Sequence, residues 1–141
     1  MQRGLTIAVV DVDPDYLGVE ICASNNRFAG STRIYAGLSE LSEFADRIAG
    51  FPSNPQDERN YEFGTRNPGF AGGYCSLHLH CIDGAGHAIL DIAFEDDDRL
   101  HETAVAKFSF CTLAADIDRF VVRLRKLEQE QSGDASLPMA L

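Results

Sequence analysis

The stretch YCSLHLHCIDGAGHAILDIAF (74–94) decides the fold, because apolar and polar residues alternate along it on both sides of a turn. Alternation with a period of two is the pattern of a strand with one buried face. The DGAG segment between the two halves supplies the glycines that a tight connection needs. The stretch is therefore predicted to form a β-hairpin with one apolar and one polar face.

The register of this hairpin follows from burial. If Ile82 pairs with His87 across the turn, every pair on one face is apolar: Cys81 with Ala88, Leu79 with Leu90, Leu77 with Ile92 and Cys75 with Phe94. A slip by one residue would mix apolar and polar side chains on both faces, which is strongly disfavoured when one face is buried. The same register places His80 opposite Ile89, and His78 opposite Asp91, on the polar face.

Four residues on or near this polar face are candidate metal ligands: His78, His80, His87 and Asp91. Opposed residues have Cβ atoms about 4.5–5.5 Å apart, which allows a hydrogen bond between His78 and Asp91. Residues two apart on a strand lie about 6.6 Å apart, so two histidines can reach one ion. The neighbouring strand is expected to add Lys107, Ser109 and Cys111 to the same face.

Two interpretations of these histidines remain open. In the first, they are solvent-facing residues of an ordinary hairpin. In the second, they hold a divalent transition metal, and Asp91 orients His78 as a ligand or base. The HxH pattern after a glycine-rich loop looks like the cupin metal motif, but Gly84 and Ala85 stand where that motif has its glutamate.

The rest of the chain predicts an α+β domain over residues 1–131. Strand patterns cover 5–13, 17–24, 27–36, 61–66 and 104–113, and helical spacing of apolar residues covers 38–48 and 114–131. This order predicts a two-layer domain in which two helices pack on one face of a largely antiparallel sheet of about six or seven strands. The last ten residues, 132–141, are predicted to form a disordered tail.

Composition and charge exclude several kinds of function. The 141 residues carry a formal net charge of −10, which disfavours binding to nucleic acid because phosphate contacts depend on clustered lysine and arginine. The apolar run near the first residues is short and leads into acidic residues, so we expect neither a signal peptide nor a membrane span, and a cytoplasmic protein. The four cysteines form no CxxC pair, which argues against a zinc knuckle.

No catalytic constellation is visible in the sequence, so no catalytic residue is assigned and an enzyme is not favoured. The chain has neither a GxSxG elbow nor a phosphate-binding loop. Two acidic clusters are candidates for binding a basic protein partner: Asp11, Asp13 and Asp15, and Asp96, Asp97 and Asp98. The second cluster lacks the spacing of an EF-hand, so calcium is not expected there.

At the level of pattern, the chain resembles small acidic bacterial α+β proteins of unknown function, some of which are immunity proteins of toxin systems. The resemblance is carried by the hairpin strands, the segment GLSELSEFADRIAGFP (37–52), the DGxG turn, and Phe120, Leu124 and Leu127 of the last helix. It implies a protein that blocks a toxin by binding it, without a cofactor. A homodimer formed through Tyr35, Tyr61 and Phe70 is a further expectation.

Overall fold

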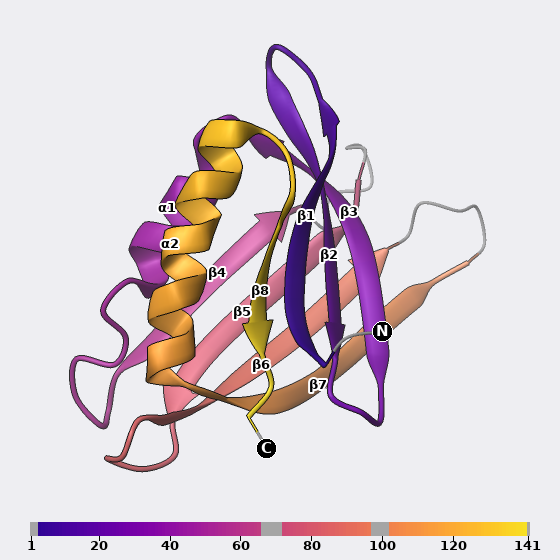
Figure 1. Ribbon diagram of the computed structural model, residues 1–141. Helices are drawn as coiled ribbons and strands as arrows, with labels where there is room; N and C mark the ends of the chain where they lie inside the picture. The colour runs from indigo at the N-terminus through magenta and orange to yellow at the C-terminus, as the bar shows by residue number, and fades with distance from the viewer. Residues whose placement is uncertain (1–2, 66–71, 97–101, 141) are drawn as a thin grey trace.

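The computed structural model describes residues 3–65, 72–96 and 102–140. It contains eight strands and two helices in the order β1 (Gly4–Val12), β2 (Tyr16–Ser24), β3 (Ala29–Gly37), α1 (Glu40–Ile48), β4 (Glu58–Gly64), β5 (Tyr74–Cys81), β6 (His87–Asp96), β7 (Ala104–Leu113), α2 (Ala114–Glu130) and β8 (Asp134–Pro138). Figure 1 shows both helices on one side of the molecule.

The strands form two antiparallel sheets of four strands each. Sheet A has the order β3-β2-β1-β8, and sheet B has the order β4-β5-β6-β7. The expected α+β class with antiparallel pairing is confirmed, but the expectation of a single sheet of six or seven strands is wrong. Each sheet has one apolar face, and the side chains of both faces belong to one core.

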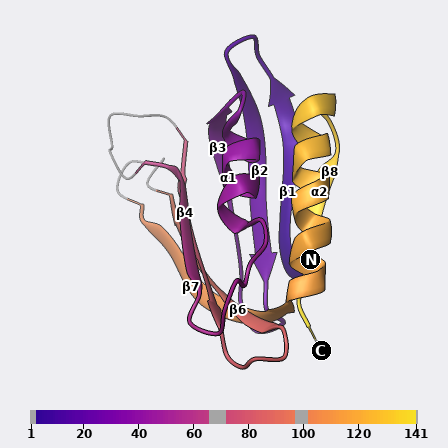
Figure 2. The ribbon, with the colours of Figure 1, turned by 90° about the vertical axis from the view of Figure 1, so that its left-hand side faces the viewer.

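The two helices contact strands of both sheets instead of covering one face of a single sheet. Helix α1 contacts β3 of sheet A and β4 of sheet B, and α2 contacts β8 of sheet A and β7 of sheet B (Figure 2). The apolar stripe of α2 is fully buried: Ile117, Phe120, Val121, Leu124 and Leu127. Within the described residues, neither helix has the length and apolar character that crossing a membrane requires.

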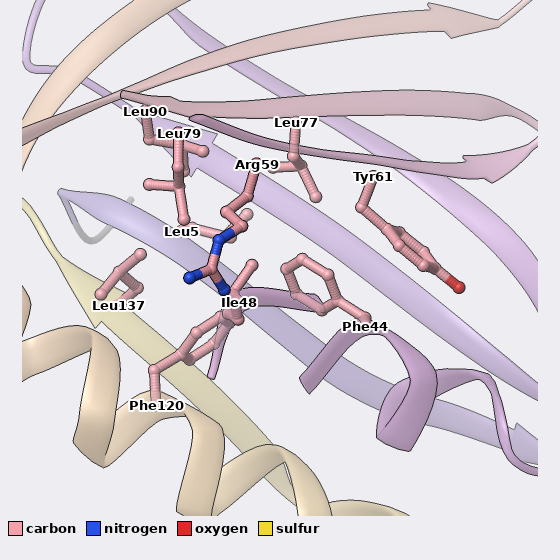
Figure 3. A pocket seen from close by; sticks show the side chains of 10 residues that line it. All are labelled: Leu5, Phe44, Ile48, Arg59, Tyr61, Leu77, Leu79, Leu90, Phe120 and Leu137. Atoms are coloured by element: carbon pink, nitrogen blue, oxygen red, sulfur yellow. The ribbon is translucent and has the colours of Figure 1, made fainter. Parts of the chain in front are cut away.

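A small cavity lies among the described core side chains. The cavity among the core side chains of both sheets and both helices has a volume of only about 10 Å³ (Figure 3). That is space for one water molecule at most. This cavity is therefore too small for a ligand larger than water.

The predicted register of the central hairpin is confirmed pair by pair. In the structure Cys81 pairs with Ala88, Leu79 with Leu90, Leu77 with Ile92 and Cys75 with Phe94, and all these residues except Cys81 are buried. On the opposite face, His78 pairs with Asp91 and His80 with Ile89. The turn closes with a hydrogen bond from Ile82 N to His87 O of 3.2 Å.

The predicted disordered tail is wrong for residues 134–138, which form β8. This strand pairs with β1 from Gly4 to Ala8 and buries Ala135 and Leu137, each 1% exposed. Gly4 adopts φ +109°, and a Cβ there would lie 2.2 Å from Leu137 O, so the close approach of the two strands requires glycine. Backbone pairing with β1 and the burial of two apolar side chains hold this strand in place.

A partly buried ion pair, Arg59 with Asp57, lies at the carboxyl end of α1. The guanidinium of Arg59 donates to Arg47 O at 2.9 Å and to Ala49 O at 3.0 Å, and these carbonyls have no partner within the helix. It also binds both carboxylate oxygens of Asp57, at 3.0 and 2.8 Å. The hydrogen bonds from Arg59 lower the pKa of Asp57, and bonds from Ser53 add to the effect against the opposing influence of burial.

This pair should make stability depend on acid pH. Because the pKa of Asp57 is lower in the folded chain than in the unfolded one, its contribution is complete above about pH 4 and is lost as the pH falls further. We expect Asp57→Asn to lower the free energy of unfolding by about 1–3 kcal/mol at pH 7 and by clearly less at pH 3. Urea unfolding of both chains at the two pH values measures this.

The matched control is Asp46→Asn. Asp46 is 69% exposed and makes an ion pair with Arg125 at 2.8 Å. Its loss should change the free energy of unfolding by no more than about 1 kcal/mol. An Asp57→Asn penalty that is the same at pH 7 and pH 3 would contradict the role given to Asp57.

Candidate metal centre

The outer face of sheet B carries rows of residues that lie side by side across the strands. One row is formed by Asn60, His78, Asp91 and Ser109, and the row beside it by Glu58, His80, Ile89 and Cys111. The inner faces of the same strands are apolar and buried, so the period of two forces these polar side chains outward. The expected placement of Ser109 and Cys111 on this face is confirmed.

Three ligand atoms converge on this face. His78 Nδ1 and His80 Nε2 each lie 3.1 Å from Asp91 Oδ2. The two imidazole rings are stacked, with centroids 5.1 Å apart and an interplanar angle of 24°. One ligand atom from each of the three residues can be chosen so that all lie within 4.8 Å of one another.

Neighbouring groups hold the ligands in position. Ser109 Oγ donates a hydrogen bond to Asp91 Oδ1, the oxygen that does not face the histidines. The second ring nitrogen of His78, Nε2, lies 3.5 Å from Glu58 Oε1. A carboxylate behind a histidine fixes its ring orientation and is the usual companion of a metal-binding imidazole.

The carboxyl group of Asp91 is suited to act as a ligand. Burial by itself raises the pKa of Asp91, but hydrogen bonds from Ser109 and His78 outweigh that effect, so the pKa is lowered. The group is therefore an ionised carboxylate at neutral pH. Asp91 is 38% exposed and the two histidines are 33% and 32% exposed, so an ion can enter from solvent.

Two of the three distances between the ligand atoms match those around a metal ion, and they are also ordinary hydrogen-bond lengths. Ligand atoms at 2.0–2.1 Å from a tetrahedral zinc ion are about 3.3 Å apart from each other. The two nitrogen to oxygen distances of 3.1 Å are close to this value. Two imidazoles and one carboxylate are a ligand set that zinc, iron and other first-row transition metals accept, with positions left for water or a small ligand.

The structure does not bring His87 into this group. Its Nδ1 lies 2.8 Å from Asp83 Oδ2, so it pairs with the hairpin turn four residues earlier. His87 is the first residue of β6 after the turn, and it pairs with Leu113 of β7. Of the four residues predicted as ligands, three are therefore together and one is held elsewhere.

The other predicted contact residues belong to several elements, and three of them lie outside the described residues. Asp11, Asp13 and Asp15 lie on the β1–β2 hairpin, which projects from the body of the protein (Figure 1). Asp96 ends β6, and Asp97, Asp98 and Phe70 lie outside the described residues. Tyr35 is 45% exposed, and Tyr61 packs against Phe44 and Phe63. Binding of a basic protein, or of a second copy, stays a prediction.

No protein-family model, no curated protein and no solved structure matches the chain. The resemblance to immunity proteins therefore stays a prediction.

Proposed function

We propose that this protein binds a divalent transition metal through His78, His80 and Asp91. The observation that carries the proposal is the convergence of two imidazole nitrogens on one carboxylate oxygen, each at 3.1 Å. His78 would bind through Nδ1 and His80 through Nε2, the atoms that face Asp91. Within the described residues, this is the one group of three histidine, cysteine or acidic side chains placed to share an ion.

Side chains on neighbouring strands hold the proposed ligands in position. The hairpin register places Asp91 opposite His78 in a row, and Ser109 on the next strand binds the far oxygen of the same carboxylate. Glu58 on a fourth strand faces the far nitrogen of His78. Side chains from all four strands of sheet B therefore contribute to one group, as in a metal site with its supporting partners.

The experiment is calorimetric titration of the metal-free protein with zinc and with cobalt. We expect one ion per chain. Loss of partners behind a ligand costs 10–100-fold in metal affinity, so loss of a direct ligand in His78→Ala, His80→Ala or Asp91→Asn should weaken binding at least about 100-fold. At a zinc concentration 100 times Kd, the folded state gains about 2.7 kcal/mol, visible as a higher Tm.

His87→Ala is the matched control. It removes an imidazole from the same hairpin, one that pairs with Asp83 and does not face Asp91. Metal affinity should stay within about 3-fold of the original value because no ligand is lost. If His87→Ala weakened binding as much as His80→Ala, or if the original chain bound no metal, the proposed centre would be wrong.

A further inference from the structure

A shallow basin lies beside the proposed metal centre, on the outer face of sheet B. It has a volume of about 300 Å³ and is lined by Ser76, His78, Asp91, Ile92, Ala93, Lys107, Phe108 and Ser109. Two of the ligands named above, His78 and Asp91, thus form part of its wall. An ion held there would have open positions that face a space large enough for a small molecule.

The basin exists because one row of the sheet has small side chains. Ser76, Ala93 and Lys107 are neighbours across β5, β6 and β7, in the row next to His78, Asp91 and Ser109. Rows on the same face lie about 6.6 Å apart along the strands. Serine and alanine do not fill the space between the imidazole on one side and the lysine on the other, so the surface is hollowed there.

The charges in this space favour an anion. Lys107 is exposed, and no ion pair joins it to another of the described residues. A divalent ion bound by Asp91 leaves one net positive charge, and Lys107 adds a second. Three glutamates lie on strands around the basin without lining it: Glu58 is beyond His78, Glu62 of β4 pairs with Ser76, and Glu95 follows Ala93 by two residues on β6. In a chain of net charge −10, the metal-loaded basin would be a local positive site.

We propose that the basin binds a small organic carboxylate, with one carboxylate group that contacts both the metal ion and the ammonium of Lys107. This inference rests on the proposed metal centre. Ser76 offers a hydroxyl donor to the carboxylate, whereas the hydroxyl of Ser109 already donates to Asp91, and Ala93 offers an apolar surface to the organic part. The metal supplies the greater part of the attraction, so the site takes up the anion only when the ion is present.

The test uses the cobalt-loaded protein, whose visible absorption reports the ligands of the ion, titrated with sodium acetate at constant ionic strength. We expect a saturable change of the cobalt spectrum. Lys107→Met should weaken acetate binding about 10-fold, as expected for loss of a charge-assisted hydrogen bond. Cobalt affinity should be unchanged or slightly tighter, because a like charge has been removed.

Two more variants test the basin without relying on Lys107 alone. Ala93→Leu fills the basin and should abolish the response to acetate while cobalt still binds. Lys126→Met changes the other lysine of the chain, which is exposed on α2, and should leave both titrations unchanged.

The outcomes separate the two proposals. Failure of cobalt to bind overturns the metal centre. If cobalt binds but acetate gives no saturable change, or acts equally on the original chain, Lys107→Met and Ala93→Leu, the basin proposal is overturned and the metal centre stands. A spectral response to inorganic phosphate and none to acetate would overturn the carboxylate assignment.

Discussion

A chain that stops at Gln131 should lose cooperative folding. The deletion removes β8, and with it five residue pairs with β1 and the buried side chains of Ala135 and Leu137. The deletion also exposes the edge of β1 and the side of α2 that packs on β8. Both changes lower the free energy of unfolding further. Together we expect a loss of more than about 5 kcal/mol, which is comparable to the whole stability of a domain of this size.

Circular dichroism and urea unfolding measure this effect. The shortened chain should show no sharp unfolding transition and should aggregate through its open sheet edge. A shortened chain with the unfolding midpoint of the original would show that β8 is dispensable.

Two substitutions within β8 separate packing from pairing. Leu137 points into the core, and Leu137→Ala should cost about 2–5 kcal/mol. Ser136 points outward and its hydroxyl meets that of Thr6 at 3.1 Å, so Ser136→Ala should cost less than about 1 kcal/mol. If the two substitutions had equal effects, the burial of β8 would not be the source of its contribution.

Phe120→Ala is expected to be the most damaging single substitution in α2. Phe120 is 1% exposed, and its ring packs edge-on against Phe44 of α1 with centroids 6.1 Å apart. It also lines the central cavity together with side chains from both sheets (Figure 3). Removal of such a ring enlarges a cavity that is already present and costs about 3–5 kcal/mol.

The measurement is the free energy of unfolding from urea curves, with Val122→Ala as the control. Val122 lies two residues away on the same helix and is 65% exposed. Its replacement should change stability by no more than about 0.5 kcal/mol, partly because alanine favours the helix more than valine does. Similar losses of unfolding free energy for the two variants would mean that the packing of Phe120 against the helices and sheets does not stabilise the protein.

The register of the central hairpin could be predicted because one of its faces is apolar and the other is polar. Each strand alternates strictly, so one register alone makes all buried pairs apolar, and the structure has that register. The proximity of His78 and Asp91 follows directly from it. The displacement of His87 does not, because Asp83 in the turn competes for its ring, and a turn's side-chain bonds are not set by the period of the strands.

Other features could not be read from local patterns. The segment DASLP (134–138) is short and contains proline, and it becomes a strand because β1 offers it an edge. The inward position of Arg59 could have been predicted from the sequence. Arg59, Tyr61 and Phe63 alternate along β4, which places the arginine on its inner face. The contact of Glu58 with His78 was not predicted because the strand pattern began at residue 61, whereas β4 begins at Glu58.

The pairing of β1 with β8 affects the order in which the two sheets can form during synthesis. Thr6 and Ser136 touch although they are 130 residues apart, so sheet A stays open until nearly all of the chain has left the ribosome. Sheet B is different, because its strands are neighbours in sequence as well as in space. The strands that carry His78, His80 and Asp91 can therefore pair with one another before the strand that completes sheet A has been made.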